Sequence, residues 1–156
     1  MSSNFANWNG DAMIDGDPLS RVLHIDLSRR RFWVVDRRDL FEKYVGGAGV
    51  AIKLLMDECP GGRDPFDPEN PMIFVVGPLI GVFPIASKTV AMFKSPHNGN
   101  LGESHAGGRS AVAIRMAGYG AIIVKGASAT PVYLVVESNR VHFRDASALW
   151  GMTSFT

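Results

Sequence analysis

The first regular structure in this chain is encoded by residues 21–36, which read RVLHIDLSRRRFWVVD. Apolar and polar residues alternate from Leu23 to Leu27, and this period of two is typical of a half-buried strand. A polar turn at Ser28–Arg30 follows, and a second strand is expected over Arg31–Asp36. The segment therefore predicts a β-hairpin, whose consecutive arginines fit a solvated tip better than a nucleic-acid contact.

Further strands and helices follow in an irregular order. Runs of apolar or β-branched residues predict strands at 72–76, 89–93, 121–124, 132–137 and 141–144. Apolar residues at helical spacing predict helices at 39–44, 50–58 and 110–116, with a last short helical segment at 145–151. This order predicts an α+β fold, a mixed β-rich sheet domain with about three short helices, rather than a parallel βαβ sheet.

The composition limits the possible functions. The chain has 156 residues, of which 46% are hydrophobic and 20% are charged, so it can form one domain with a core. Its single cysteine excludes a disulfide framework and a self-sufficient zinc or iron–sulfur site. A net charge of +1 gives no broad electrostatic reason to bind nucleic acid. No apolar run approaches the roughly 20 residues that span a bilayer, so we expect no membrane contact.

The N-terminal segment differs from the rest. Residues 1–18 lack apolar periodicity and mix Ser, Asn, Gly and Asp around Trp8, so we expect an arm that is flexible or that orders against a partner. The segment also lacks the basic and then apolar order of a signal peptide, which predicts a cytoplasmic protein. The folded domain is expected to cover residues 19–156.

Glycines precede the third predicted helix and indicate an anion site. Gly107 and Gly108 leave the first backbone N–H groups of that helix accessible, and Arg109 adds a positive charge. Lys88 flanks the preceding strand. His105 is expected in the glycine-rich loop before the helix, and loops often carry binding residues. The same residues also fit a plain connector with a solvated arginine, and their types alone do not decide between the two.

Other motifs give weaker indications. Gly47–Gly49 begins like a dinucleotide fingerprint, but Ile52 replaces its third glycine and a helix rather than a strand is predicted before it. Close backbone approach, or the start of the next helix, explains those glycines better. The histidines show no metal-ligand spacing, and His24 and His142 are expected at solvated outward positions. Cys59 has no nearby histidine, and neither a catalytic pair nor a metal site is evident.

Several short blocks stand in a fixed order along the chain. They are RVLHIDLS at 21–28, YVGGAGVA at 44–51, DPENPMIF at 67–74, GPL at 77–79, KSP at 94–96, SHAGGR at 104–109, AGY at 117–119, PVY at 131–133 and DASALWG at 145–151. From about residue 21 to residue 156, the chain therefore resembles the N-terminal domain of the tungsten-dependent aldehyde ferredoxin oxidoreductase family.

The resemblance implies a cofactor and the residues that hold it. In that family this domain is the base that carries tungsten (or molybdenum) as a bis-pterin cofactor. Lys88 falls where the family has a basic residue, and His105–Arg109 falls on the loop that meets the pterin and its phosphate. Ala48 replaces a family arginine, Ile85–Ser87 replaces a glycine-rich turn, and His105 replaces an asparagine of some members. The implied cofactor-binding residues are Lys88, His105, Ala106, Gly107, Gly108 and Arg109.

The reaction implied by the resemblance converts an aldehyde and water to a carboxylic acid, with two electrons leaving through an iron–sulfur cluster. The cluster and the acid–base residues are expected in other domains or in a partner chain, so this chain alone is not catalytically complete. Expected partners are a larger chain with the remaining oxidoreductase domains, or a homo-oligomer, and a ferredoxin-type electron carrier. The alternative function is a non-catalytic binding or assembly module derived from this domain.

Overall fold

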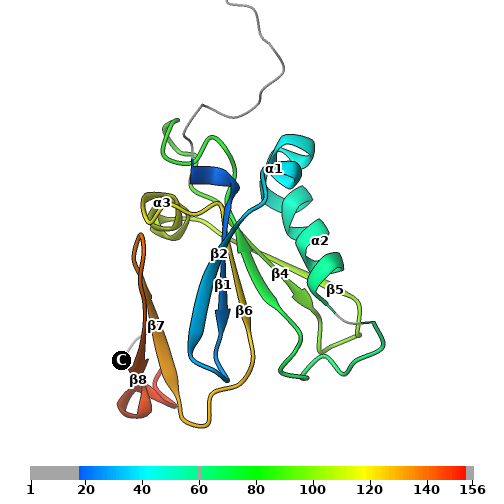
Figure 1. The fold of residues 1–156 in the computed structure, drawn as a ribbon, viewed down its shortest axis with the longest axis vertical. Helices are drawn as coiled ribbons and strands as arrows, with labels where there is room; N and C mark the ends of the chain where they lie inside the picture. Colours follow the sequence, from blue (N-terminus) through cyan, green and yellow to red (C-terminus); the bar gives the residue numbers. More distant parts are fainter. Residues whose placement is uncertain (1–17, 60, 154–156) are drawn as a thin grey trace, which may run out of the picture.

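Among residues 18–59 and 61–153, the part of the chain described by this computed structural model, six strands form one mixed sheet (Figure 1). Their order is β2-β1-β6-β3-β4-β5; β1 and β6 pair in parallel, and the other neighbours are antiparallel. Two further strands, β7 and β8, form a separate antiparallel pair. The predicted α+β class is confirmed. The strands are β1 Arg21–Asp26, β2 Arg31–Asp36, β3 Met72–Val75, β4 Thr89–Lys94, β5 Leu101–Ala106, β6 Ala121–Lys125, β7 Val132–Val136 and β8 Val141–Asp145.

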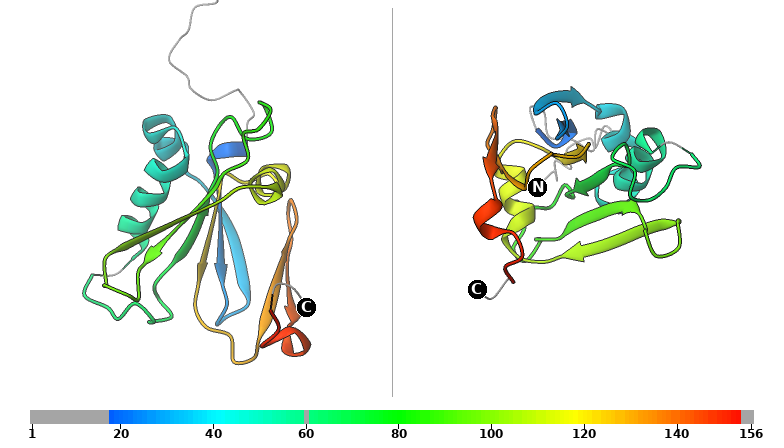
Figure 2. Two further views of the ribbon diagram at one scale, coloured as in Figure 1. Left: turned by 180° about the vertical axis from the view of Figure 1, so that it is seen from behind. Right: turned by 90° about the horizontal axis from the view of Figure 1, so that it is seen from below.

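Helices and the β7–β8 hairpin lie on the two faces of the sheet (Figure 2). α1 (Arg38–Tyr44) and α2 (Gly47–Glu58) pack on one face, where their apolar side chains join those of β3 and β4 in the larger core. α3 (Arg109–Met116) connects β5 to β6 and lies beside the hairpin, which packs on the other face. Short 3-10 turns, η1 (Pro18–Ser20) and η2 (Ser147–Leu149), stand before β1 and after β8.

Most predicted elements lie within a few residues of their expected positions. The hairpin over residues 21–36 is β1–β2, with Arg21 opposite Asp36 and Asp26 opposite Arg31. The three predicted helices are α1, α2 and α3, and the expected last helical segment is the 3-10 turn η2. The predicted arm and Trp8 lie outside the described residues, apart from Pro18 in η1. Within the described ranges, no helix has the length and apolar character needed to cross a membrane.

One prediction about secondary structure is wrong. The residues expected to form a glycine-rich loop around His105 instead form β5, an edge strand that pairs with β4 from Leu101 to Ala106. Most side chains of β5 are exposed, so the strand lacks the apolar alternation by which strands are predicted. The strand has a glycine at position 102 for a steric reason, because a Cβ there would lie 2.5 Å from the ring of Phe93.

Candidate functional site

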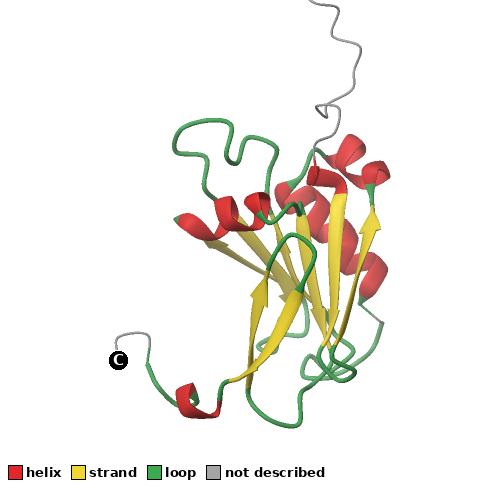
Figure 3. Ribbon diagram, turned by 60° about the vertical axis from the view of Figure 1, so that its left-hand side comes forward, coloured by secondary structure: helices red, strands yellow, loops and turns green. Residues whose placement is uncertain are grey.

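Strand pairing brings the predicted cofactor-binding residues to one end of the sheet. Thr89 begins β4, Ala106 ends β5, and these two residues are directly paired. Lys88 therefore stands next to the β5–α3 junction, which begins with Gly107. The Thr89 Oγ1 atom lies 2.8 Å from Ser110 Oγ, and this hydrogen bond ties the first turn of α3 to β4. In Figure 3 the long loop between β3 and β4 lies at this same end, on the side of α3, where a Cβ at Gly81 would lie 3.8 Å from Arg115.

The start of α2 lies at the same end of the sheet. The Gly47 N–H donates to the Val76 carbonyl (3.2 Å), directly after β3, whose Val75 pairs with Val90 of β4. Gly46 precedes this turn with φ +126°, and a Cβ at Gly46 would lie 3.1 Å from the Val76 oxygen. These glycines allow close backbone approach and also begin a helix, as predicted.

Two helices thus begin at this end of the sheet without a side-chain cap. Gly46 and Gly108 are the N-cap residues of α2 and α3, both have positive φ, and neither helix has a side-chain hydrogen bond at its cap. The anion-site prediction considered α3 but not α2. Both segments have a glycine directly before a helical pattern of apolar residues. This shared signal could have predicted that α2 also starts without a side-chain cap.

The chemistry of this end favours an anionic ligand. The backbone N–H groups at a helix start carry partial positive charge, and no side-chain cap satisfies them in α3. A Cβ added to Gly107 or Gly108 would meet no atom within 4 Å, so open space lies before this backbone. Lys88 and Arg109 are both exposed and contribute positive charge. This donor set suits a phosphate or a similar oxyanion.

His105 lies on β5, two residues before Gly107. It pairs with Val90, so its side chain is on the same face of the sheet as that buried residue. Its Nε2 atom lies 2.6 Å from Glu103 Oε1 on the same strand. The structure therefore places Lys88 and Ala106–Arg109 together, and it places His105 on the adjoining strand instead of in a loop.

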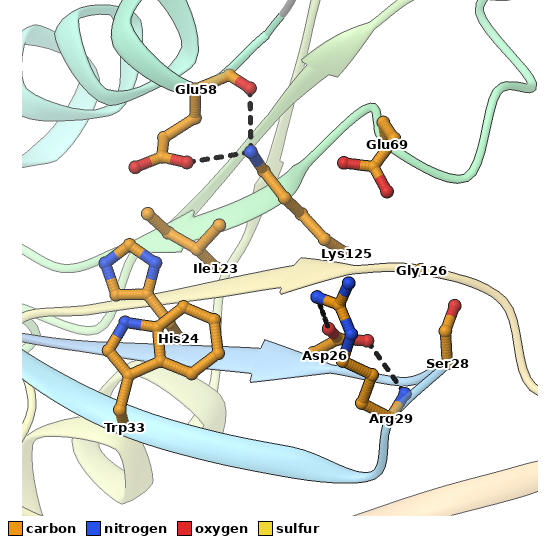
Figure 4. Close-up of a pocket in the computed structure, with 10 residues that line it drawn as sticks. All are labelled: His24, Asp26, Ser28, Arg29, Trp33, Glu58, Glu69, Ile123, Lys125 and Gly126. Carbon is orange, nitrogen blue, oxygen red and sulfur yellow. Dashed lines mark hydrogen bonds and ion pairs between the residues drawn. The ribbon is translucent and has the colours of Figure 1, made fainter.

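A second polar region, a hollow of about 240 Å³, lies at the opposite end of the sheet (Figure 4). The Lys125 Nζ atom is 2.8 Å from both the carboxylate and the backbone oxygen of Glu58, which ends α2. Asp26 accepts hydrogen bonds from the backbone N–H and the guanidinium of Arg29. The positive and negative side chains pair with one another within the hollow. The hollow is therefore less suited to bind an anionic ligand than the α3 end of the sheet is.

The prediction that His24 is solvated is wrong. His24 is partly buried in this hollow, and its ring stacks on Trp33 with centroids 5.2 Å apart. Burial lowers the pKa of His24 below its ordinary value, and the nearby Glu58 carboxylate opposes that shift only in part. The error arises because Trp33, which is paired with His24 on the neighbouring edge strand β2, covers the histidine ring.

This lowered pKa predicts how stability depends on pH. His24 takes up a proton more readily in the unfolded chain, so its contribution is complete above the unfolded pKa and declines as pH falls below it. We expect the urea midpoint to fall between about pH 7.5 and pH 5.5. His24→Gln should reduce that fall, whereas His142→Gln should preserve it. An unchanged pH dependence in His24→Gln would contradict the role of His24.

Among the described residues, no group of three or more His, Cys, Asp or Glu side chains is placed to hold a metal ion. Cys59 directly follows α2 as its C-cap residue, and its Sγ atom lies 3.3 Å from Asn70 Oδ1. The α3 end of the sheet therefore remains the candidate site, and its chemistry is that of anion binding.

One family model and several relatives match most of this chain. Residues 22–156 match the family model described as aldehyde ferredoxin oxidoreductase, N-terminal domain. The tungsten-containing aldehyde ferredoxin oxidoreductase of Thermococcus kodakarensis is 37% identical over 133 residues, which are 84% of this chain and 22% of that protein. The aliphatic sulfonate oxidoreductase, WOR-like subunit, of Pyrococcus furiosus is 32% identical over 136 residues, with 85% of this chain and 22% of that protein covered.

A solved structure shares the fold. It is the active site complex BamBC of benzoyl coenzyme A reductase with 1,5-dienoyl-CoA, with a TM-score of 0.80 and 36% identity. The match covers 85% of this chain and 21% of the solved chain. The present chain thus spans about a fifth of the length of the proteins that it matches.

Proposed function

The chain belongs to the aldehyde ferredoxin oxidoreductase N-terminal domain family, and we propose that it holds the tungsten–pterin cofactor of an oxidoreductase. The observation that carries this proposal is the pairing of Thr89 with Ala106, which places Lys88 beside the uncapped start of α3. The relatives named as tungsten-containing support the choice of tungsten over molybdenum.

Each part of the site has a role in holding the cofactor. Gly107 and Gly108 let the pterin phosphate approach the backbone, because no side chain occupies the space before them. Arg109 and Lys88 supply charge-assisted hydrogen bonds to its oxygens. Ala106 and His105 border the pterin on the β5 side. When bound, the tungsten–pterin supplies two-electron chemistry, and these residues retain and orient it.

The proposed reaction is the oxidation of an aldehyde with water to a carboxylic acid. The relatives' names cover an aldehyde, an aliphatic sulfonate and benzoyl coenzyme A, at 37%, 32% and 36% identity to this chain. Similar identity to enzymes with different substrates fits a domain that holds the cofactor while other domains select the substrate. The aldehyde assignment follows the family model and the tungsten-containing relatives.

We propose that a larger chain or further domains cover part of this domain's surface. The β1–β2 and β7–β8 hairpins share a local turn after their last strand. In each turn an aspartate, Asp36 or Asp145, accepts a hydrogen bond from the backbone N–H two residues later. Five residues after each aspartate stands an aromatic residue: Phe41 is 1% exposed, whereas Trp150 is 77% exposed. Leu149 (55% exposed) and Met152 (59% exposed) stand beside Trp150 in the sequence, and exposed apolar residues grouped in this way favour a partner. The iron–sulfur cluster and the contact with a ferredoxin-type carrier would lie on that partner.

The proposal is tested by the cofactor content of the protein isolated anaerobically from its own host. Elemental analysis measures tungsten and molybdenum, and the fluorescence of oxidised pterin measures the organic part. We expect tungsten and pterin in a constant ratio to protein. Protein that contains neither above background would overturn the proposal and favour the binding or assembly module.

A further inference from the structure

Two side chains on β5 form a pair whose purpose the fold does not explain. Glu103 and His105 are two residues apart on one strand, so both lie on the same face of the sheet. The Glu103 Oε1 and His105 Nε2 atoms are 2.6 Å apart, while the two side chains remain 36% and 42% exposed. They stand opposite Met92 and Val90, which are buried, so the pair sits at the open edge of the core.

The pair determines which ring nitrogen of His105 remains available. A carboxylate that accepts from Nε2–H fixes the imidazole orientation and leaves Nδ1 as the unprotonated ring nitrogen. Without that partner, a partly exposed histidine on an edge strand samples several rotamers and both tautomers. The hydrogen bond therefore leaves one defined ring nitrogen of His105, Nδ1, available to a ligand.

The charges around the pair favour a ligand on the side of His105. Lys88 directly precedes Thr89, which pairs with Ala106, and Arg109 begins α3 three residues after Ala106. The Glu103 carboxylate lies on the other side of His105 along β5. The hydrogen bond from His105 holds this carboxylate on the side of the ring that is farther along β5 from Lys88 and Arg109.

We propose that Glu103 is a positioning residue, which holds His105 so that its unprotonated Nδ1 atom can accept a hydrogen bond from an N–H group of the pterin. This inference rests on the proposed function, and it assigns a role to a residue outside the predicted cofactor-binding set. His105 contacts the cofactor, whereas Glu103 acts through His105. An asparagine at position 105 would need no such partner, because its amide presents a donor and an acceptor in one group.

The test is a double-mutant cycle on the protein isolated anaerobically from its host. Glu103→Gln should lower the retained tungsten and pterin about tenfold, as expected when the outer partner of a ligand is removed. His105→Asn should retain the cofactor nearly as wild type does, and adding Glu103→Gln to His105→Asn should change nothing further. Glu69→Gln, an exposed glutamate away from the site, serves as the matched control.

A second readout distinguishes positioning from general structural support. Nitrogen NMR of the cofactor-free chain should show His105 with its proton on Nε2 in wild type and a tautomer mixture in Glu103→Gln. Equal cofactor loss from Glu103→Gln in both backgrounds, or an unchanged tautomer, would overturn the positioning role. Wild-type protein that lacks the cofactor would instead overturn the proposed function, so the two failures are distinguishable.

Discussion

Gly120→Ala is expected to prevent this domain from folding. A Cβ at Gly120 would lie 1.6 Å from the Leu19 carbonyl oxygen and 2.8 Å from Cζ of Phe41, both parts of buried residues. The backbone cannot move aside, because the Gly120 N–H donates to Arg21 and its carbonyl accepts from Val76, each at 3.0 Å. Relief of the overlap would break the contact between η1, β3 and β6.

The expected cost of this change is comparable with the stability of a whole domain, about 5–15 kcal/mol. Circular dichroism and urea denaturation should find no cooperative transition in Gly120→Ala. Gly61→Ala is the matched control, because a Cβ there meets no atom within 4 Å, and it should unfold at the wild-type midpoint. A wild-type midpoint for Gly120→Ala would show that the packing around η1 is different from that described.

Reversing both charges at the candidate site should remove the cofactor without unfolding the protein. In the proposed complex Lys88 and Arg109 each donate a charge-assisted hydrogen bond, worth about 1.5–3 kcal/mol. Loss of both, together with repulsion from two new carboxylates, predicts cofactor retention at least about 100-fold weaker. Both side chains are exposed, so the urea midpoint of Lys88→Glu/Arg109→Glu should stay near that of wild type.

The matched control for this double variant is Arg31→Glu/Arg140→Glu, which makes the same charge change at two exposed positions on the hairpins. Tungsten and pterin content after gel filtration provides the measurement. The control should keep both components. Equal losses in the two double variants would mean that net charge, rather than the α3 end of the sheet, governs retention.

Local features of this fold were predictable because they depend on residues a few positions apart. Gly118 is an example, since a glycine after a helical repeat predicts the helix end. In the structure Gly118 has φ +84°, and its N–H donates to the Arg115 carbonyl while the Tyr119 N–H donates to Ile114. The β1–β2 hairpin was predictable for the same reason, because alternation and turn lie in one segment.

The site was predictable only in part, because its residues meet through strand pairing. The glycines and Arg109 indicate an anion site locally, but nothing in the sequence pattern places Lys88 beside Gly107. Lys88 lies beside Gly107 because of the β4–β5 register. β5 itself was not predicted, because its residues are mostly exposed and lack apolar alternation. The start of α2 joins the same end through Gly47 and Val76, a contact that depends on tertiary structure.

Native mass spectrometry of the protein isolated anaerobically from its host shows whether this chain itself holds the metal–pterin. Elemental analysis of a preparation does not say which chain carries the cofactor, whereas a mass assigns it. We expect a species that contains this chain, a larger partner chain and a mass increment equal to metal-bound pterin. A bare chain or homo-oligomer, with no cofactor mass in any species that contains it, would mean that this chain does not hold the cofactor.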